Sequence, residues 1–185
     1  MKKIKDRITL GIVSGLFGTA LKIASDEFFS KKKISKRSFR ETASGVWVST
    51  RRQAKSPYGQ ILGSLLDLGM GMVGSVGQVY ILSKTGKDNL FVKGTFFGIA
   101  YGSLITAGLS ALPTNKVRPK DAESNLSYMA SHALFGLATT YTISALGDKS
   151  LWDVPPSNNY IKPTQYTTAE TNKESPEASE WSTIR

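Results

Sequence analysis

Four ionisable side chains lie well inside long apolar stretches of a chain of 185 residues, whereas Glu27 lies near the end of such a stretch. The four are Lys22, Asp26, Asp67 and His132. A charge deep in a bilayer costs about 2.5 to 3.5 kcal/mol on insertion scales, so we expect such groups to be paired or hydrated. Carboxylates and an imidazole near a lysine can bind a proton or an ion. These four residues are therefore the candidate buried polar site.

Their spacing places them at a similar depth. Asp67 follows Tyr58 by nine residues and His132 follows Ser124 by eight, which at 1.5 Å per residue is about 12 to 14 Å in each case. Two interpretations stay open. Asp67 and His132 could titrate with Lys22 as the counter-charge, or a buried ion pair could only fix the register of the helices. His132 could equally hydrogen-bond a neighbouring backbone carbonyl.

The apolar stretches that carry these residues are long enough to cross a membrane, which takes about 20 residues for a core of roughly 30 Å. We predict spans at about 8–29, 58–83, 90–112 and 124–147. The first is the weakest, because Lys22, Asp26 and Glu27 interrupt it. It is expected to be an uncleaved span or a re-entrant helix, since no small-x-small cleavage site follows. The predicted fold is all-α, a four-helix transmembrane bundle.

Composition divides the chain into a membrane domain, 1–147, and a tail, 148–185. The first part holds all 17 glycines, and the second holds four of the seven prolines, which predicts an extended, largely disordered tail. The chain has no cysteine and one histidine, which argues against disulfides and common zinc sites. No nucleophile, base and orienting group are suitably spaced. We therefore expect no enzyme, metal or cofactor.

Small residues recur at every fourth position of each predicted span. In a bilayer, helices associate where small residues let their backbones approach. The four stripes predict a tight bundle, and they also offer surfaces for self-association. The glycines expected at helix contacts are Gly63, Gly71, Gly94, Gly98, Gly102 and Gly136.

The segment 31–56 carries nine Lys or Arg and is too polar to cross a membrane. Ser38 and Glu41 fit a capping box, and the apolar residues after them recur with helical spacing. This pattern predicts an interfacial amphipathic helix with Phe39 and Trp47 at headgroup level, and the alternative is a solvated basic loop. The residues expected to contact anionic lipid headgroups are Arg37, Arg40, Trp47, Arg51 and Arg52.

Basic residues are unevenly distributed between the two ends of the predicted bundle. The end with segments 31–56 and 113–123 has twelve Lys or Arg, and the other end has eight. By the positive-inside rule the first end faces the cytoplasm and both termini lie outside, whereas a re-entrant first segment would place the N-terminus inside. This distribution follows membrane topology, and no nucleic-acid motif accompanies the net charge of +10. The G-x-G-x-x-G match at 69–74 lies within a span, so we expect no nucleotide site.

Several residues resemble a known family. Gly11-Ile-Val-Ser-Gly15, Lys22, Asp26, Ser127 and His132 resemble the small bacterial inner-membrane proteins that include YagU and YqhR. The segment with Arg40-Glu-Thr-Ala43 and Gly45-Val-Trp47 is similar to uncharacterised four-span proteins of Gram-positive bacteria. The resemblance implies a multi-pass protein of the bacterial cytoplasmic membrane without assigned chemistry.

Two functional hypotheses follow. In the first, the buried polar layer binds, senses or conducts a proton, an ion or a small solute. In the second, the chain is a non-catalytic scaffold that forms homo-oligomers through its small-residue stripes and binds anionic lipid or a partner through its basic segment. Access of water to Asp67 would distinguish the two hypotheses.

Overall fold

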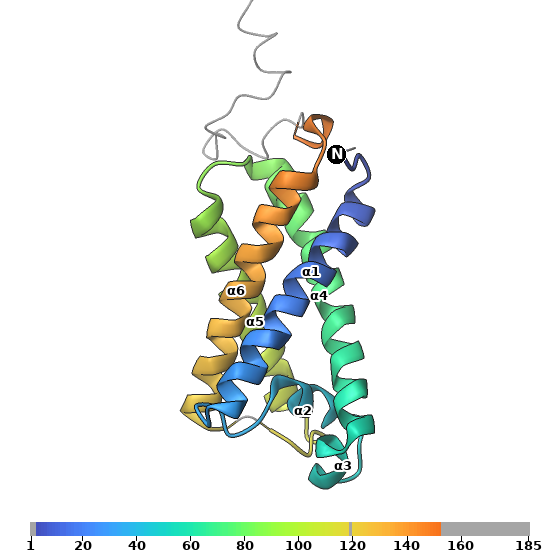
Figure 1. The fold of residues 1–185 in the computed structure, drawn as a ribbon, viewed down its shortest axis with the longest axis vertical. Helices are drawn as coiled ribbons and strands as arrows, with labels where there is room; N and C mark the ends of the chain where they lie inside the picture. The colour runs from blue at the N-terminus through green and yellow to red at the C-terminus, as the bar shows by residue number, and fades with distance from the viewer. Residues whose placement is uncertain (1–2, 119, 153–185) are drawn as a thin grey trace, which may run out of the picture.

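The computed structural model describes residues 3–118 and 120–152, and these residues form a bundle of four long helices closed at one end by two short ones (Figure 1). The long helices are α1 (Arg7–Lys31), α4 (Pro57–Thr85), α5 (Leu90–Ala111) and α6 (Ala122–Leu146). The short ones are α2 (Phe39–Ser44) and α3 (Arg51–Lys55), and a 3₁₀ turn, η1, covers Lys149–Leu151. The described part of the chain is thus all-helical, as the sequence predicts.

Helix α1 is continuous, although its sequence is the least apolar of the predicted spans near its end. It begins at Asp6, whose carboxylate accepts the Thr9 N–H at 2.6 Å, and it runs for 25 residues, or about 37 Å. It extends along the whole bundle, from the end with the N-terminus to the end with α2 (Figure 1). The structure therefore contains one unbroken helix at this position.

The four long helices pack in the order α4, α1, α6, α5. Helix α1 packs against both α4 and α6, and α5 packs against α6. Helices α4 and α5 are antiparallel and are joined by a short turn in which Gly86 adopts a φ of 79°. Short connections predict packed neighbours, but α4 and α5 make few direct contacts. The reason is that Gly71 of α4 packs against α1, whereas Gly94, Gly98 and Gly102 of α5 pack against α6.

The bundle has large apolar side chains outside and small or polar ones inside. Ile8, Phe17, Leu65, Phe96 and Leu104 are among the many large apolar residues that are exposed. Buried positions on α1, α4 and α6 hold many serine, threonine, glutamine and charged residues, beside apolar ones such as Leu10, Val79 and Phe135. A protein in water has the opposite preference, because burial of apolar surface is what stabilises it.

Three helices of the described part, α1, α4 and α5, are long and apolar enough to cross a membrane. Helix α6 was predicted as a clear span but does not meet the same criterion of hydropathy, whereas the doubtful first segment does. The difference arises because α6 has 25 residues but carries many polar groups. Its buried polar residues are Ser124, Ser127, Ser131, His132, Thr139 and Thr140.

The basic segment folds beneath the bundle as α2 and α3 rather than as one interfacial helix. Ser38 caps α2 by accepting the Glu41 N–H at 3.2 Å, as the capping box predicts. The prediction that Phe39 lies at headgroup level is wrong, since Phe39 is buried between α1, α4 and α6. The Asp26 carboxylate holds it there by accepting the Phe39 N–H at 2.8 Å. Trp47 is 70% exposed.

At the end of the bundle away from α2 and α3, the first described residues pair with the residues that follow α6. Ile4 donates to the Leu146 carbonyl at 2.9 Å and accepts the Asp148 N–H at 3.0 Å. Leu151 is buried in an apolar cluster with residues of α1, α4 and α6. Residues 148–152 therefore pack on the bundle, although the sequence analysis assigned them to the tail. The rest of the predicted tail, 153–185, lies outside the described residues.

Candidate buried polar site

A buried ion pair between α1 and α4 is the centre of the candidate site. Lys22 Nζ donates to both Asp67 oxygens, at 2.7 Å and 2.6 Å, and the two side chains are 2% and 6% exposed. Close backbone packing makes this contact short, since a Cβ on Gly15 would lie 2.8 Å from the Gly71 carbonyl oxygen. Of the partners that the sequence offered to Asp67, the structure selects Lys22.

Phe39 covers the lysine from the side of α2. The Lys22 ammonium lies 3.8 Å from the centroid of the Phe39 ring, in the arrangement of a cation–π contact. The Phe39 ring also contacts the His132 ring, in an edge-to-face arrangement with centroids 4.9 Å apart. Sequence reasoning missed this role of Phe39. The capping box located the start of α2 but carried no information about where the helix would pack.

The Asp26 carboxylate accepts a hydrogen bond from α2 and not from Lys22, which lies one turn earlier in α1. One oxygen accepts the Phe39 N–H, and the other oxygen is buried without a hydrogen-bond partner among the described residues. An unpaired buried carboxylate oxygen is uncommon in folded proteins. With His132 neutral, Lys22, Asp26 and Asp67 give this layer one more formal negative charge than positive charge.

His132 is buried and its Nδ1 lies 2.7 Å from the Tyr128 carbonyl oxygen, one turn earlier in α6. Because a carbonyl only accepts, Nδ1 carries the proton. This is the backbone contact that the sequence analysis gave as the alternative to a bond with Asp67. The ring also lies against α5, where a Cβ on Gly102 would come within 2.3 Å of it.

Lys22, Asp67 and His132 line one small internal cavity of about 10 Å³, together with Thr19 and Tyr101. A space of this size holds about one water molecule. The structure therefore brings three of the four predicted site residues to a common space. Asp26 does not line this cavity. It lies one turn after Lys22 in α1, where it accepts the Phe39 N–H.

Unpaired polar groups continue from this layer along the interior of α1 and α4. Each is a buried oxygen without a hydrogen-bond partner among the described residues. They are the oxygens of Ser14, Thr19 and Ser75, and Oε1 of Gln78. We call this column, with Lys22, Asp26, Asp67 and His132, the polar chamber.

Apolar clusters close the polar chamber at both ends. Toward the chain termini, Leu10, Val79 and Leu82 belong to one buried cluster. At the other end, Phe39, Ala43 and Tyr128 form a second one. The buried polar groups thus lie between two apolar clusters, where electrostatic interactions are stronger than in water.

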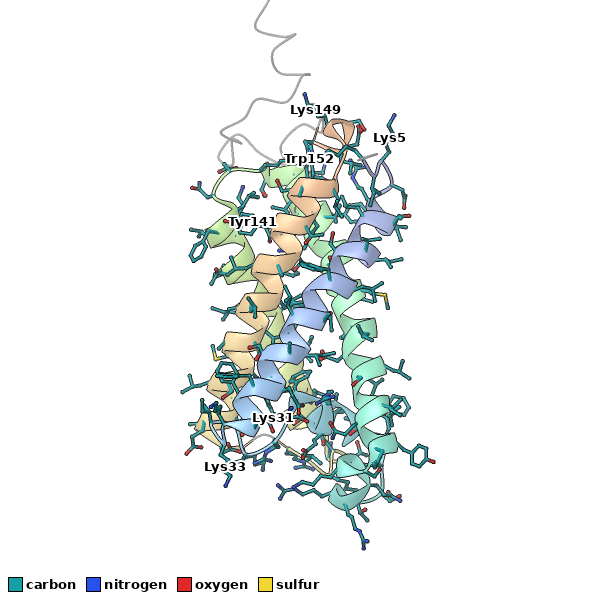
Figure 2. The ribbon with its side chains drawn as sticks, viewed as in Figure 1. Lys5, Lys31, Lys33, Tyr141, Lys149 and Trp152 are labelled. Atoms are coloured by element: carbon teal, nitrogen blue, oxygen red, sulfur yellow. The ribbon has the colours of Figure 1, made fainter. Side chains whose placement is uncertain are left out.

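The residues predicted to bind lipid headgroups fall into two groups. We call the end of the bundle with α2 and α3 the basal end. Arg37 pairs with Asp121, and Arg40 pairs with Glu27, so these two arginines hold the loops of the basal end to the bundle. Trp47, Arg51 and Arg52 are exposed at the same end. Figure 2 shows Lys31 and Lys33 at this basal end and Lys5 and Lys149 at the opposite one, so basic side chains lie at both ends of the apolar surface.

The predicted packing glycines are used for contacts within the chain. Gly94 and Gly98 face Gly136 across the α5/α6 contact, where an added Cβ would meet backbone atoms at 2.1 to 2.9 Å. Gly71 faces α1, and Gly63 faces the Arg40 carbonyl of α2. Within the described residues, these glycines therefore pack against other helices of the same chain.

Comparison with known proteins found no match among protein-family models, curated proteins or solved structures.

Proposed function

We propose that the chain is a multi-pass membrane protein with four crossing helices, α1, α4, α5 and α6. The observation that supports this is the reversed distribution of side chains, with large apolar residues outside and charged or polar ones inside. The polar face of α6 is buried against α1 and α5, so it need not face lipid. The bacterial cytoplasmic membrane and kinship with the YagU and YqhR family remain part of this proposal.

The proposed orientation places the basal end, with α2 and α3, in the cytoplasm. Twelve Lys or Arg lie at or near that end, against eight at the other. The Ile4–Gly147 bridge brings the N-terminal segment and the end of α6 to the same end of the bundle. Both would therefore lie on the outer side.

Within this protein, we propose that the polar chamber binds a proton or a small cation and conducts protons across the membrane. Two carboxylates and one lysine leave a formal excess of negative charge, and one Asp26 oxygen accepts no hydrogen bond from the part of the chain that the structure describes. Both Asp67 oxygens are occupied by Lys22, so a cation that binds Asp67 must displace the ammonium. A proton on Asp67 would have the same effect, because it removes the charge that holds Lys22.

Opening of the chamber on the side of α2 requires movement at the base. Phe39 lies over Lys22 and is fixed by Asp26, and α2 is further tied to α1 through Arg40 and Glu27. Protonation of Asp26 would weaken its hydrogen bond to the Phe39 N–H, because a charged acceptor binds more strongly than a neutral one. We infer that binding in the chamber and release of α2 are coupled in this way.

The test is proton flux in reconstituted vesicles, measured with an internal pH-sensitive dye across a range of external pH. We expect the native chain to respond to pH, and both Asp67→Asn and Asp26→Asn to lose the response. Asp88→Asn is the matched control, since it also removes a carboxylate paired with a lysine, Lys93, but lies outside the chamber. Equal flux in all four proteins, or flux in none of them, would contradict the proposal.

A further inference from the structure

A second and larger hollow opens between α4 and α5 in the basal half of the bundle, and Asp67 of the polar chamber forms part of its wall. Its volume is about 630 Å³, and its walls include Leu66 and Met70 of α4 and Leu104 and Gly108 of α5. It exists because these consecutive helices hardly touch there. Tyr101 closes its upper end by donating to the Met70 carbonyl at 2.6 Å, and Trp47 lies at its lower end.

The walls of this groove are suited to hydrocarbon. Asp67 is the one charged residue among them, and Lys22 occupies both of its oxygens. The groove follows α5 from Tyr101 to Leu112, a length of about 16 Å at 1.5 Å per residue. One leaflet of a membrane contributes about half of a core of roughly 30 Å. The groove therefore has the depth of one acyl chain measured from the basal surface.

The backbone of Lys116 lies close to the lower end of the groove. The Lys116 N–H donates at 2.9 Å to the carbonyl of Gly45, the residue before Val46, which lines the groove. The Lys116 side chain is exposed and is in no ion pair within the described part of the chain. Trp47, which lines the groove two residues after Gly45, is 70% exposed, and tryptophan is enriched at the level of lipid headgroups.

We propose that this groove binds one anionic phospholipid of the surrounding bilayer. One acyl chain lies between α4 and α5 below Tyr101, and the phosphate lies at the basal end near Lys116 and Trp47. The apolar walls select a hydrocarbon chain, and the excess of lysine and arginine at the base selects a negative headgroup. This site goes beyond binding of a proton or a cation in the chamber, and it differs from general attraction of the basic segment to a membrane surface.

Fluorescence quenching of Trp47 tests the proposal. The full chain with Trp152→Phe and Trp181→Phe leaves Trp47 as the one tryptophan. It is reconstituted in phosphatidylcholine vesicles that contain a minor fraction of phosphatidylglycerol brominated on its acyl chains. We expect this lipid to quench Trp47 more strongly than brominated phosphatidylcholine at the same fraction.

Two pairs of variants then locate the site. Gly108→Phe fills the groove, whereas Gly77→Phe adds the same side chain at a helical position outside it, and at both positions a Cβ would meet nothing within 4 Å. Gly108→Phe should abolish the excess quenching and Gly77→Phe should preserve it. Lys116→Gln should weaken binding about fivefold, since one lysine near an anionic surface contributes about 1 kcal/mol, and Lys33→Gln should not.

Three results would overturn the proposal. The first is equal quenching by the anionic and zwitterionic lipids. The second is unchanged quenching in both Gly108→Phe and Lys116→Gln, of which the latter is a surface change that leaves packing intact. The third is protection of Trp47 from both lipids in a dimer detected by light scattering, because a second copy would then occupy the groove.

Discussion

Breaking the Lys22–Asp67 pair is expected to destabilise the bundle strongly, and replacing both residues is expected to destabilise it much less. The side chains are 2% and 6% exposed, so solvent does not screen the charge that a single substitution would leave unpaired. Removing one partner of a buried pair typically costs about 3 to 5 kcal/mol. Lys22→Met keeps the length of the side chain, and Asp67→Asn keeps the shape of the carboxylate.

The single variants differ in what remains behind. After Lys22→Met, the Asp67 carboxylate faces a small cavity with no cation in hydrogen-bonding contact. After Asp67→Asn, the Lys22 ammonium still lies against the Phe39 ring, a contact worth about 2 kcal/mol when desolvated. We therefore expect the loss of unfolding free energy to be larger for Lys22→Met than for Asp67→Asn.

The measurement is a double-mutant cycle on the protein in detergent micelles, with unfolding followed by circular dichroism. The coupling energy should be about 2 kcal/mol or more, since residues in one buried pair are not additive. The Lys36–Glu123 pair serves as the control, because both of its side chains are more than half exposed, and it should couple by less than about 1 kcal/mol. Additive effects for Lys22 and Asp67, or losses below about 1 kcal/mol for each, would refute the reasoning.

Three further predictions concern packing, acid stability and orientation. Gly98→Ala should lower the unfolding free energy by about 1 to 3 kcal/mol, because its Cβ would lie 2.1 Å from a backbone oxygen of α6. Gly77→Ala, at a position where a Cβ meets nothing within 4 Å, should raise the unfolding free energy slightly. Equal shifts of the thermal unfolding temperature in the two variants would contradict this prediction. Hydrogen bonds from Thr9 lower the pKa of Asp6, so its contribution to stability is present above the unfolded pKa of about 4 and is lost as the pH falls through the lower folded value. Asp6→Asn should remove this part of the acid dependence in thermal unfolding curves, and an unchanged dependence would argue against the cap. A reporter that is active only in the cytoplasm should be inactive when fused to Arg185, and strong activity would reverse the proposed orientation.

The sequence was sufficient to predict features that depend on neighbours in the chain. Apolar length located the four long helices, and the Ser38–Glu41 spacing located the start of α2. Counting residues from the ends of spans placed Asp67 and His132 at one depth, and both line the same cavity. The rise per residue of a helix is fixed, so depth follows from position alone.

Features that depend on contacts between distant segments could not be predicted in the same way. Phe39 is aromatic and follows a basic run, which is also the pattern of an interfacial residue; its burial depends on Asp26, thirteen residues earlier. Arg37 and Arg40 are similar in sequence context to the exposed Arg51, and only the positions of Asp121 and Glu27 separate them. The α4/α5 groove exists because α4 packs against α1 and α5 packs against α6, and no short sequence pattern predicts this arrangement.

The order of helices along the chain has a consequence for how such a protein enters a membrane. Helix α6 is the one long helix of the described residues that is not apolar enough by itself to cross a membrane, and it packs against α1 and α5, which are both synthesised before it. When α6 leaves the ribosome, the surfaces that cover its serine, threonine and histidine face are already available. We expect α6 to insert poorly by itself and efficiently after its partners. A chain rearranged so that α6 is made first should therefore fail at insertion, even though every contact of the finished bundle would be the same.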